Sequence, residues 1–168
     1  VQLPRLYLAW PTVPDFSKLQ AALDILSIIL TDGRSSRLNK NLVYESQKAH
    51  DVRAFHHGQE ISGEFHLTAT VTPEGDINEL EKEIRAELEE LRVKAPSEAE
   101  VMRAKNRIES YYVMQMEKIG GFGGRADQLN YYNVMAGDPS VITTDIDRYK
   151  AITSNDIYEA AQLLGNNH

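Results

Sequence analysis

The chain has 168 residues, contains no cysteine, and carries 18 Lys and Arg against 25 Asp and Glu, a formal net charge of −7. A chain of this length buries roughly 70% of its unfolded surface, which is enough for one domain whose core needs no disulfide or structural metal. The acidic balance disfavours a nucleic-acid partner, because phosphate binding needs a basic face. Without cysteine, a thiol nucleophile and a cysteine zinc site are excluded.

The hydropathy of the chain predicts no membrane span. Its longest apolar stretch, Leu23–Leu30, still contains Asp24 and Ser27 and is far shorter than the ~20 residues that a spanning helix needs. The sequence opens Val1-Gln2-Leu3-Pro4, with neither an initiating Met nor the basic start of a signal peptide. Such a start is typical of a fragment or of a mature product.

The N-terminal segment predicts a strand followed by a buried helix. Apolar residues alternate over 3–10 as in a strand, and Pro11 is expected to end it. A helix is predicted over 16–30, with Asp15 as its N-cap. That helix is apolar almost all round towards its end, so it should be buried on most sides. Within it, Asp24 is the one polar residue that stands out; the alternative is that it simply faces solvent near the first turns of the helix.

A second helix and a β-hairpin come next. The helix is predicted from about 36 to 48, and two strands follow at 51–57 and 64–71. Apolar residues alternate along the second strand, as in a sheet with one buried face. Gly58 and Gly63 bracket the connection, which predicts a hairpin with a loop of about five residues.

Helical periodicity dominates the second half of the chain. The clearest helix is 76–93, whose apolar positions step by three or four residues. Ser97 and Glu100 have the spacing of a capping box and are expected to start a long helix. The remaining predicted helices are 125–135 and a last one capped by residues 153–156.

The order of these elements indicates the fold class. A strand, two helices, two strands and then helices is not a regular βαβ alternation, so a doubly wound parallel sheet is not expected. We predict a single α+β domain over residues 1–168, with helices packed on one face of a partly antiparallel sheet. Two tyrosine pairs at helical positions, residues 111–112 and 131–132, are expected to be core or half-buried side chains.

Three of the five histidines gather in the predicted hairpin. His57 and His66 could approach each other across it, and Glu60 could complete a metal site. His56 and His57 are neighbours on a strand and should point to opposite faces, so they cannot both be ligands. The alternative is that all three are strand and loop histidines without a metal. No helical zinc motif, His-Glu-x-x-His or its inverse, is present, and the residues alone indicate no catalytic constellation.

Several motifs carry a resemblance to a known family. They are LYLAWP at 6–11, GRSSRL at 33–38, GDP at 137–139 and T-x-x-D at 153–156. At these spacings they resemble the non-catalytic, C-terminal or inactive, half-domain of the insulinase/pitrilysin (M16-type) zinc metallopeptidases, the family that includes mitochondrial processing peptidase. The resemblance covers nearly the whole chain.

The resemblance implies a metallohydrolase-like half-domain of the processing-peptidase and insulinase type, ending here before a final strand. It would pair with a zinc-bearing half-domain of the same or a paired chain. The implied parent is a hydrolase whose halves enclose a chamber that degrades extended peptides, with this domain as one wall. Because the chain lacks the family's His-x-x-Glu-His motif, it is expected to hold no zinc and to be inactive alone. The resemblance also favours a periplasmic location in a bacterium.

One departure from the family pattern concerns the active site. Half-domains that complete it from across the chamber resemble L-R-x-x-x-Q-L-x-Y, and here Val43 and His50 stand in place of the Arg and the Tyr. His50 can still donate a hydrogen bond, which makes it the candidate substrate-binding residue. Val43 cannot replace an arginine, so no catalytic residue is expected. The alternative is a proteolytically silent scaffold subunit of the same fold, comparable to the core proteins of a respiratory complex.

Overall fold

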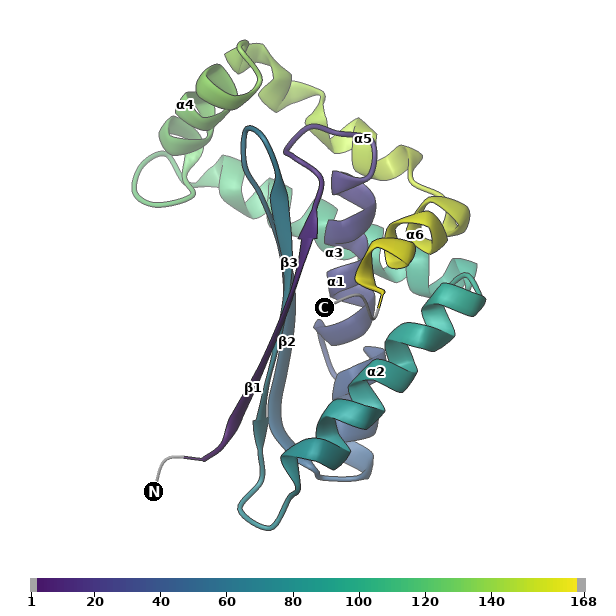
Figure 1. Cartoon of the computed structure of the whole chain (residues 1–168). Coiled ribbons are helices and arrows are strands. Elements are labelled where there is room, and N and C mark those ends of the chain that lie inside the picture. The colour runs from purple at the N-terminus through teal and green to yellow at the C-terminus, as the bar shows by residue number, and fades with distance from the viewer. Residues whose placement is uncertain (1–2, 166–168) are drawn as a thin grey trace.

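The structure, a computed structural model, describes residues 3–165 and has two layers, a sheet and the helices on one of its faces (Figure 1). The strands are β1 (Arg5–Thr12), β2 (Ala49–Gly58) and β3 (Gly63–Val71). Their spatial order is β1-β3-β2, and both pairs are antiparallel. The α+β fold is therefore confirmed, and the sheet of the described residues is antiparallel throughout rather than in part.

Helices make up most of the remaining described chain. The α-helices are α1 (Gln20–Thr31), α2 (Ile77–Val93), α3 (Glu98–Glu117), α4 (Arg125–Met135), α5 (Asp145–Ala151) and α6 (Ser154–Ala161). Shorter turns are a π-helix, η1 (Asn39–Glu45), and the 3-10 helices η2 (Pro139–Thr143) and η3 (Gln162–Leu164). In Figure 1, α1 lies beside the sheet, between the strands and α6, while α3 leads away to α4 near the hairpin end of the sheet. None of the helices in residues 3–165 is long and apolar enough to cross a bilayer.

The core lies between the sheet and α1. On the central strand β3, Phe65, Leu67 and Ala69 are fully buried, while the alternating His66 and Thr68 face the other side. This is the period of two that puts successive strand residues on opposite faces. α1 packs against β2, α3, α5 and α6, which explains why its sequence is apolar almost all round.

The caps predicted at Ser97 and Thr153 are confirmed, and the structure adds one at Asp76. The side chain of Asp76 caps α2 by accepting from the Asn78 amide. Ser97 and Glu100 form the expected capping box at α3, and Thr153 and Asp156 form one at α6. A cap of this kind stabilises a helix by about 1 kcal/mol, because it satisfies backbone N–H groups that the first turn leaves without partners.

Two expectations for the N-terminal segment are wrong. Pro11 does not end the strand, since β1 continues to Thr12 and Pro11 pairs in register with Glu64. A proline is tolerated there because β1 is an edge strand of the described sheet. Asp15 is not the N-cap of α1, which begins at Gln20 without a side-chain cap. Phe16 adopts a left-handed backbone with φ of 58°, so the helix cannot start beside Asp15.

The second predicted helix is shorter than expected, and one helix escaped prediction. The π-helix η1 ends at Glu45, and Gln47 has a φ of 53° that turns the chain into β2. β2 starts at Ala49 because that residue already pairs with Val71. Helix α5 has only 7 residues, too few for an apolar period to be recognised in the sequence.

Candidate functional site

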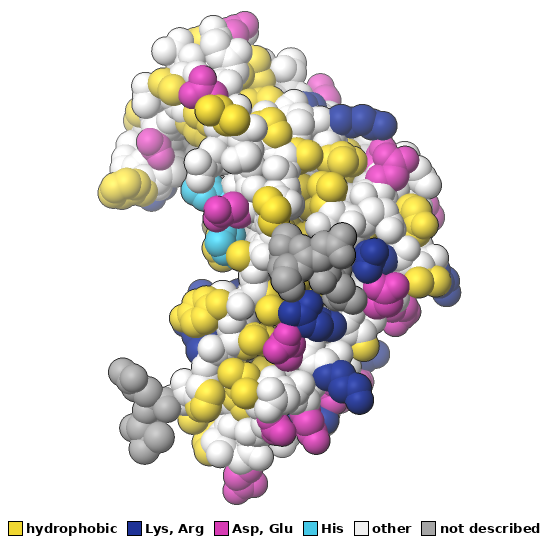
Figure 2. Space-filling view, in the orientation of Figure 1, with side chains coloured by type: hydrophobic (Ala, Val, Ile, Leu, Met, Phe, Trp, Pro, Cys, Tyr) yellow, Lys and Arg dark blue, Asp and Glu magenta, His cyan; other side chains and the backbone are white. Residues whose placement is uncertain are grey.

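The second face of the sheet carries no helix and is open to solvent. Tyr7 of β1 is 68% exposed and Phe55 of β2 is 49% exposed, and both side chains belong to this face. The outline of the molecule is hollowed between α4 and the sheet, and histidine side chains lie there (Figure 2). A sheet with one covered and one open face has room for a further layer or a ligand on the open side.

Two hollows lie along the outer edge of β2, where this strand has no strand partner within the described residues. The first, the His50 hollow, has a volume of about 500 Å³ and is lined by Val43, Gln47 and His50 among others. The second, the β2 groove, has a volume of about 670 Å³ and is lined by residues 50–55 together with parts of α1, η1 and α3. Because Val43 and His50 line both, the two hollows adjoin each other.

A third hollow continues this path between the helices. The tyrosine cavity, about 300 Å³ in volume, is lined by α1, α3, α4 and α5 and takes its name from five tyrosines, Tyr111, Tyr112, Tyr131, Tyr132 and Tyr149. It shares Ser27, Ile28 and Tyr111 with the β2 groove. The three hollows therefore adjoin one another, and together they form a track along β2 and α1.

The candidate substrate-binding residue, His50, stands at one end of this track. Its side chain is 70% exposed, and its Nδ1 lies 4.0 Å from Oδ2 of Asp51. The register between β2 and β3 shifts between Ala49 and Asp51, and such an irregularity redirects a side chain at the edge of a sheet. Val43, which stands in place of the family's arginine, lines the same hollow, so both positions of the family pattern lie together.

The three candidate metal ligands do not gather into a site. His66 Nε2 lies 2.9 Å from Glu64 Oε2, and its ring stacks on Phe55 with centroids 4.9 Å apart. His57 stands opposite Glu64 in the strand register, and Glu60 lies in the connecting loop. In the part of the chain that the structure describes, no group of three His, Asp or Glu side chains is arranged to hold a metal ion. The residues that the structure describes therefore do not fit a resident zinc.

His56 points to the helix side of the sheet, away from His57, as the strand period predicts. Its side chain is fully buried; Nε2 lies 3.0 Å from Thr12 Oγ1, and Nδ1 lies 3.5 Å from Asp24 Oδ1 without forming a hydrogen bond. Gly63 allows this packing, because a Cβ there would approach the imidazole Nε2 to 2.8 Å. His56 thus connects the sheet to the polar side of α1.

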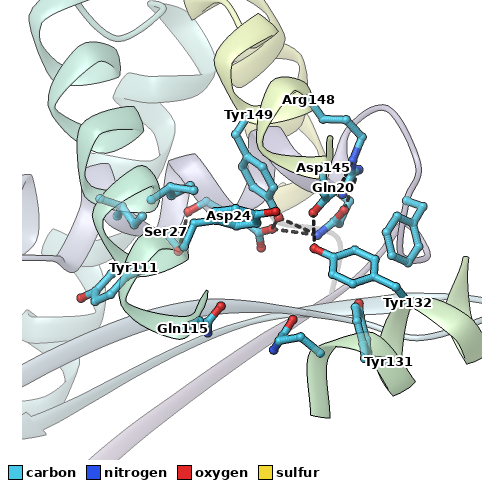
Figure 3. A pocket seen from close by; sticks show the side chains of 15 residues that line it. Gln20, Asp24, Ser27, Tyr111, Gln115, Tyr131, Tyr132, Asp145, Arg148 and Tyr149 are labelled. Carbon is cyan, nitrogen blue, oxygen red and sulfur yellow. Dashed lines mark hydrogen bonds and ion pairs between the residues drawn. The ribbon is translucent and has the colours of Figure 1, made fainter. Parts of the chain in front are cut away.

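Asp24 lies in the wall of the tyrosine cavity rather than simply facing solvent. Its Oδ2 accepts hydrogen bonds from the Tyr149 hydroxyl and from Gln20 Nε2, each at 2.8 Å (Figure 3). The side chain is 24% exposed. An aspartate within an apolar helix was the one signal in the sequence for this site, but the sequence did not show which residues surround it.

A second carboxylate, Asp145, lies deeper in the same cavity and is 6% exposed. The Tyr132 hydroxyl donates to its Oδ2 at 2.8 Å, and Arg148 Nε donates to its Oδ1 at 2.5 Å. Arg148 also donates to Gln20 Oε1 at 2.9 Å. Its guanidinium lies 5.0 Å from the ring centroid of Phe16, within the range of a cation–π contact.

Burial and the two carboxylates raise the pKa of several phenols in this cavity. Burial, the largest cause, together with the hydrogen bond to Asp145 raises the pKa of Tyr132. For Tyr149, burial and the charge of Asp24 raise the pKa in the same way. Burial also raises the pKa of Tyr112, whose buried hydroxyl has no hydrogen-bond partner among the described residues. These tyrosines are therefore neutral hydrogen-bond donors at physiological pH.

The GRSSRL motif has a structural role rather than a place in the track. Arg37 Nε donates to Glu100 Oε1 at 2.6 Å, and its Nη1 donates to Glu87 Oε1 at 3.0 Å. Burial tends to raise the pKa of Glu100, but its hydrogen bonds with Arg37 and Ser97 outweigh this and lower it to about 2. The arginine therefore ties the turn after α1 to α2 and α3.

The fold and the open sheet edge define a half-domain in which helices cover one face of an antiparallel sheet. The chain belongs to the peptidase M16 inactive-domain family, whose model, described as the peptidase M16 inactive domain, matches residues 1–108. This confirms the resemblance to the non-catalytic half of the insulinase/pitrilysin peptidases. A comparison with curated proteins gave no match.

Solved structures of bacterial proteases share the fold. The chain is similar to a protease from Helicobacter pylori with 23% identity and a TM-score of 0.81, over 96% of this chain and 38% of that one. It is similar to a protein assigned as a zinc protease in Bordetella pertussis, with 25% identity and a TM-score of 0.76, over 94% and 84% of the two chains. The periplasmic protease PqqL from Escherichia coli, 15% identical with a TM-score of 0.72, matches over 95% of this chain and 17% of its own. The chain thus spans well under half the length of the Helicobacter protease.

Proposed function

We propose that the chain is the non-catalytic half of a zinc metallopeptidase and forms one wall of a peptide-degrading chamber. The observation that carries this proposal is the track of adjoining hollows along β2, which leads from the His50 hollow through the β2 groove to the tyrosine cavity. A strand rises about 3.3 Å per residue, so the 10 residues of β2 offer a path of about 33 Å to an extended chain.

The wall would act by shape and positioning rather than by chemistry. An extended peptide can lie along one strand, and a closed chamber would admit such a chain and exclude folded proteins. Holding the peptide in one orientation lowers the entropic cost of the reaction in the facing half. At one end of the track, the exposed imidazole of His50 would donate a hydrogen bond to a peptide carbonyl.

Zinc and the catalytic base would belong to a partner half-domain of the same or a paired chain. The likeness to proteases of which this chain spans only a part, 38% for the Helicobacter protease, supports a second half. Zinc held there would polarise the peptide carbonyl and activate water. The likeness to PqqL supports a periplasmic location for the assembly.

The proposal is tested by photo-crosslinking in the full chain. A photoreactive phenylalanine analogue replaces Arg53, an exposed residue of the β2 groove, or Val93, a 73% exposed residue at the end of α2 outside the track. With an unstructured peptide, crosslinking at position 53 is expected to exceed that at position 93 several-fold. Equal or absent crosslinking would contradict a peptide-binding wall.

A cleavage assay then separates the peptidase from its alternative. The chain is mixed with the zinc-bearing M16 half encoded in the same genome, and cleavage of an unstructured fluorogenic peptide is followed. Cleavage that requires both halves supports the proposal. The presence of Val43 in place of an arginine favours the second candidate, a proteolytically silent scaffold, which predicts peptide binding or assembly without any cleavage.

A further inference from the structure

The tyrosine cavity is graded from an open mouth to a closed end. At its mouth, Tyr111 is 41% exposed and Tyr131 is 37% exposed. At its closed end, Gln20, Tyr132 and Asp145 are buried. The mouth shares Tyr111 with the β2 groove, so the two hollows adjoin there.

The two carboxylates of the cavity, Asp145 and Asp24, have different partners. Asp145 is paired with the one cation lining the cavity among the described residues, Arg148, and also accepts from a tyrosine. Asp24 accepts only from neutral donors, Tyr149 and Gln20, at its Oδ2. Its Oδ1 faces the buried Nδ1 of His56 at 3.5 Å, a contact that is not a hydrogen bond. Among the described residues, Asp24 therefore forms no ion pair with a lysine or arginine.

The aromatic walls of the cavity favour a cation, in addition to the negative charge of Asp24. Aromatic faces attract cations through the ring quadrupole, and the guanidinium of Arg148 already lies 5.0 Å from Phe16 and 5.5 Å from Tyr149. An alkyl stem can pack on the same rings while its charged end reaches a carboxylate. Figure 3 shows Asp24, Tyr149 and Tyr132 converging on one region of the cavity.

We propose that the tyrosine cavity binds the lysine or arginine side chain of an extended peptide lying in the β2 groove, with Asp24 as the counter-charge. The proposal rests on the proposed function for the peptide backbone and adds a substrate class to it: chains that carry a basic residue at one defined position. The acidic and aromatic lining would select against neutral and acidic side chains at that position.

The test compares two blocked, fluorescent, unstructured peptides that differ at one central residue: lysine, or norleucine, which keeps the four-carbon stem and lacks the ammonium group. Anisotropy titrations of the full chain at low salt are expected to show about tenfold tighter binding of the lysine peptide, the size of one charge-assisted hydrogen bond. Asp24→Asn keeps the side-chain shape and an acceptor oxygen and is expected to abolish this preference. Asp147→Asn, an exposed carboxylate on α5 that does not line the cavity, should retain it.

The other outcomes separate the two proposals. Equal binding of the two peptides would overturn the basic-side-chain site and leave the peptide-binding wall standing. Binding of neither peptide would overturn both. N-acetyl-lysine methylamide tests the source of the cation: if it binds as tightly as the lysine peptide, the site serves a free cation and the peptide part of the proposal is wrong. An equal loss of preference in Asp147→Asn would assign the effect to long-range charge instead of to the cavity.

Discussion

Helix α1 has two sides that are stabilised in different ways. On one side, Leu23, Leu26 and Leu30 are fully buried in the core. On the other, Gln20, Asp24 and Ser27 follow one another at helical spacing and line the tyrosine cavity. The core side depends on close packing, whereas the cavity side depends on hydrogen bonds around a hollow. The packing that stabilises the fold therefore lies on one side of the helix, and the polar groups that line the cavity lie on the other.

The largest expected effect lies on the core side. Leu26→Ala should lower the free energy of unfolding by about 2–5 kcal/mol, because it removes buried methyl groups and leaves a void in a fully buried position. Urea denaturation followed by circular dichroism measures the change. Ser27→Ala on the cavity side is the matched control, and a loss there as large as that of Leu26→Ala would break the contrast between the two sides.

The next effect concerns the ion pair that holds α3 to the turn after α1. The folded pKa of Glu100, about 2, lies below its ordinary value of 4.5, so its contribution to stability is full above about pH 4.5 and is lost as pH falls towards 2. Glu100→Gln should lose about 1–3 kcal/mol at neutral pH, because charge-assisted hydrogen bonds to Arg37 are lost.

Denaturation of both proteins across this pH range is the measurement. The wild-type chain is expected to lose more stability on acidification than Glu100→Gln, since the variant has no carboxylate to protonate at that position. Parallel curves for the two proteins would show that the Arg37 contact does not contribute to acid sensitivity.

A smaller effect is expected at the closed end of the cavity. Tyr132→Phe removes the hydroxyl that donates to the buried carboxylate of Asp145. Among the described side chains, Arg148 then remains as the hydrogen-bond donor to this carboxylate. The expected loss is about 1–2 kcal/mol, the cost of one missing hydrogen bond to a charged group. Tyr7→Phe, at a 68% exposed tyrosine on the open sheet face, should leave the unfolding midpoint unchanged.

The smallest effect on stability is expected at a residue that belongs to neither side of α1. Phe122 stands in the glycine-rich turn between α3 and α4 and is 98% exposed. Phe122→Ala should change the free energy of unfolding by less than about 0.5 kcal/mol, as is usual for exposed positions. A loss of more than about 1 kcal/mol in the free energy of unfolding would show that this turn packs against the chain more closely than its exposure indicates.

Much of the fold follows from local patterns. The apolar period of α2, the capping residues Asp76, Ser97 and Thr153, and the alternation along β3 each involve residues close together in the chain. Local preferences and local periods therefore predict these elements without knowledge of the rest of the molecule. The strand through Pro11 was mispredicted because only the sheet order shows that β1 lies at an edge.

The sequence by itself determined the α+β class, the family and the departure at Val43, since each rests on short motifs and their spacing. Only the tertiary structure decided the candidate site. Asp24 and Tyr149 are 125 residues apart, and Gln20 and Arg148 are 128 apart, yet each pair is hydrogen-bonded in one cavity. Contacts of this range depend on how α1, α4 and α5 pack together, and no local pattern encodes that packing. An aspartate in an apolar helix and tyrosines on distant helices acquire a shared chemistry only when the core has brought them together.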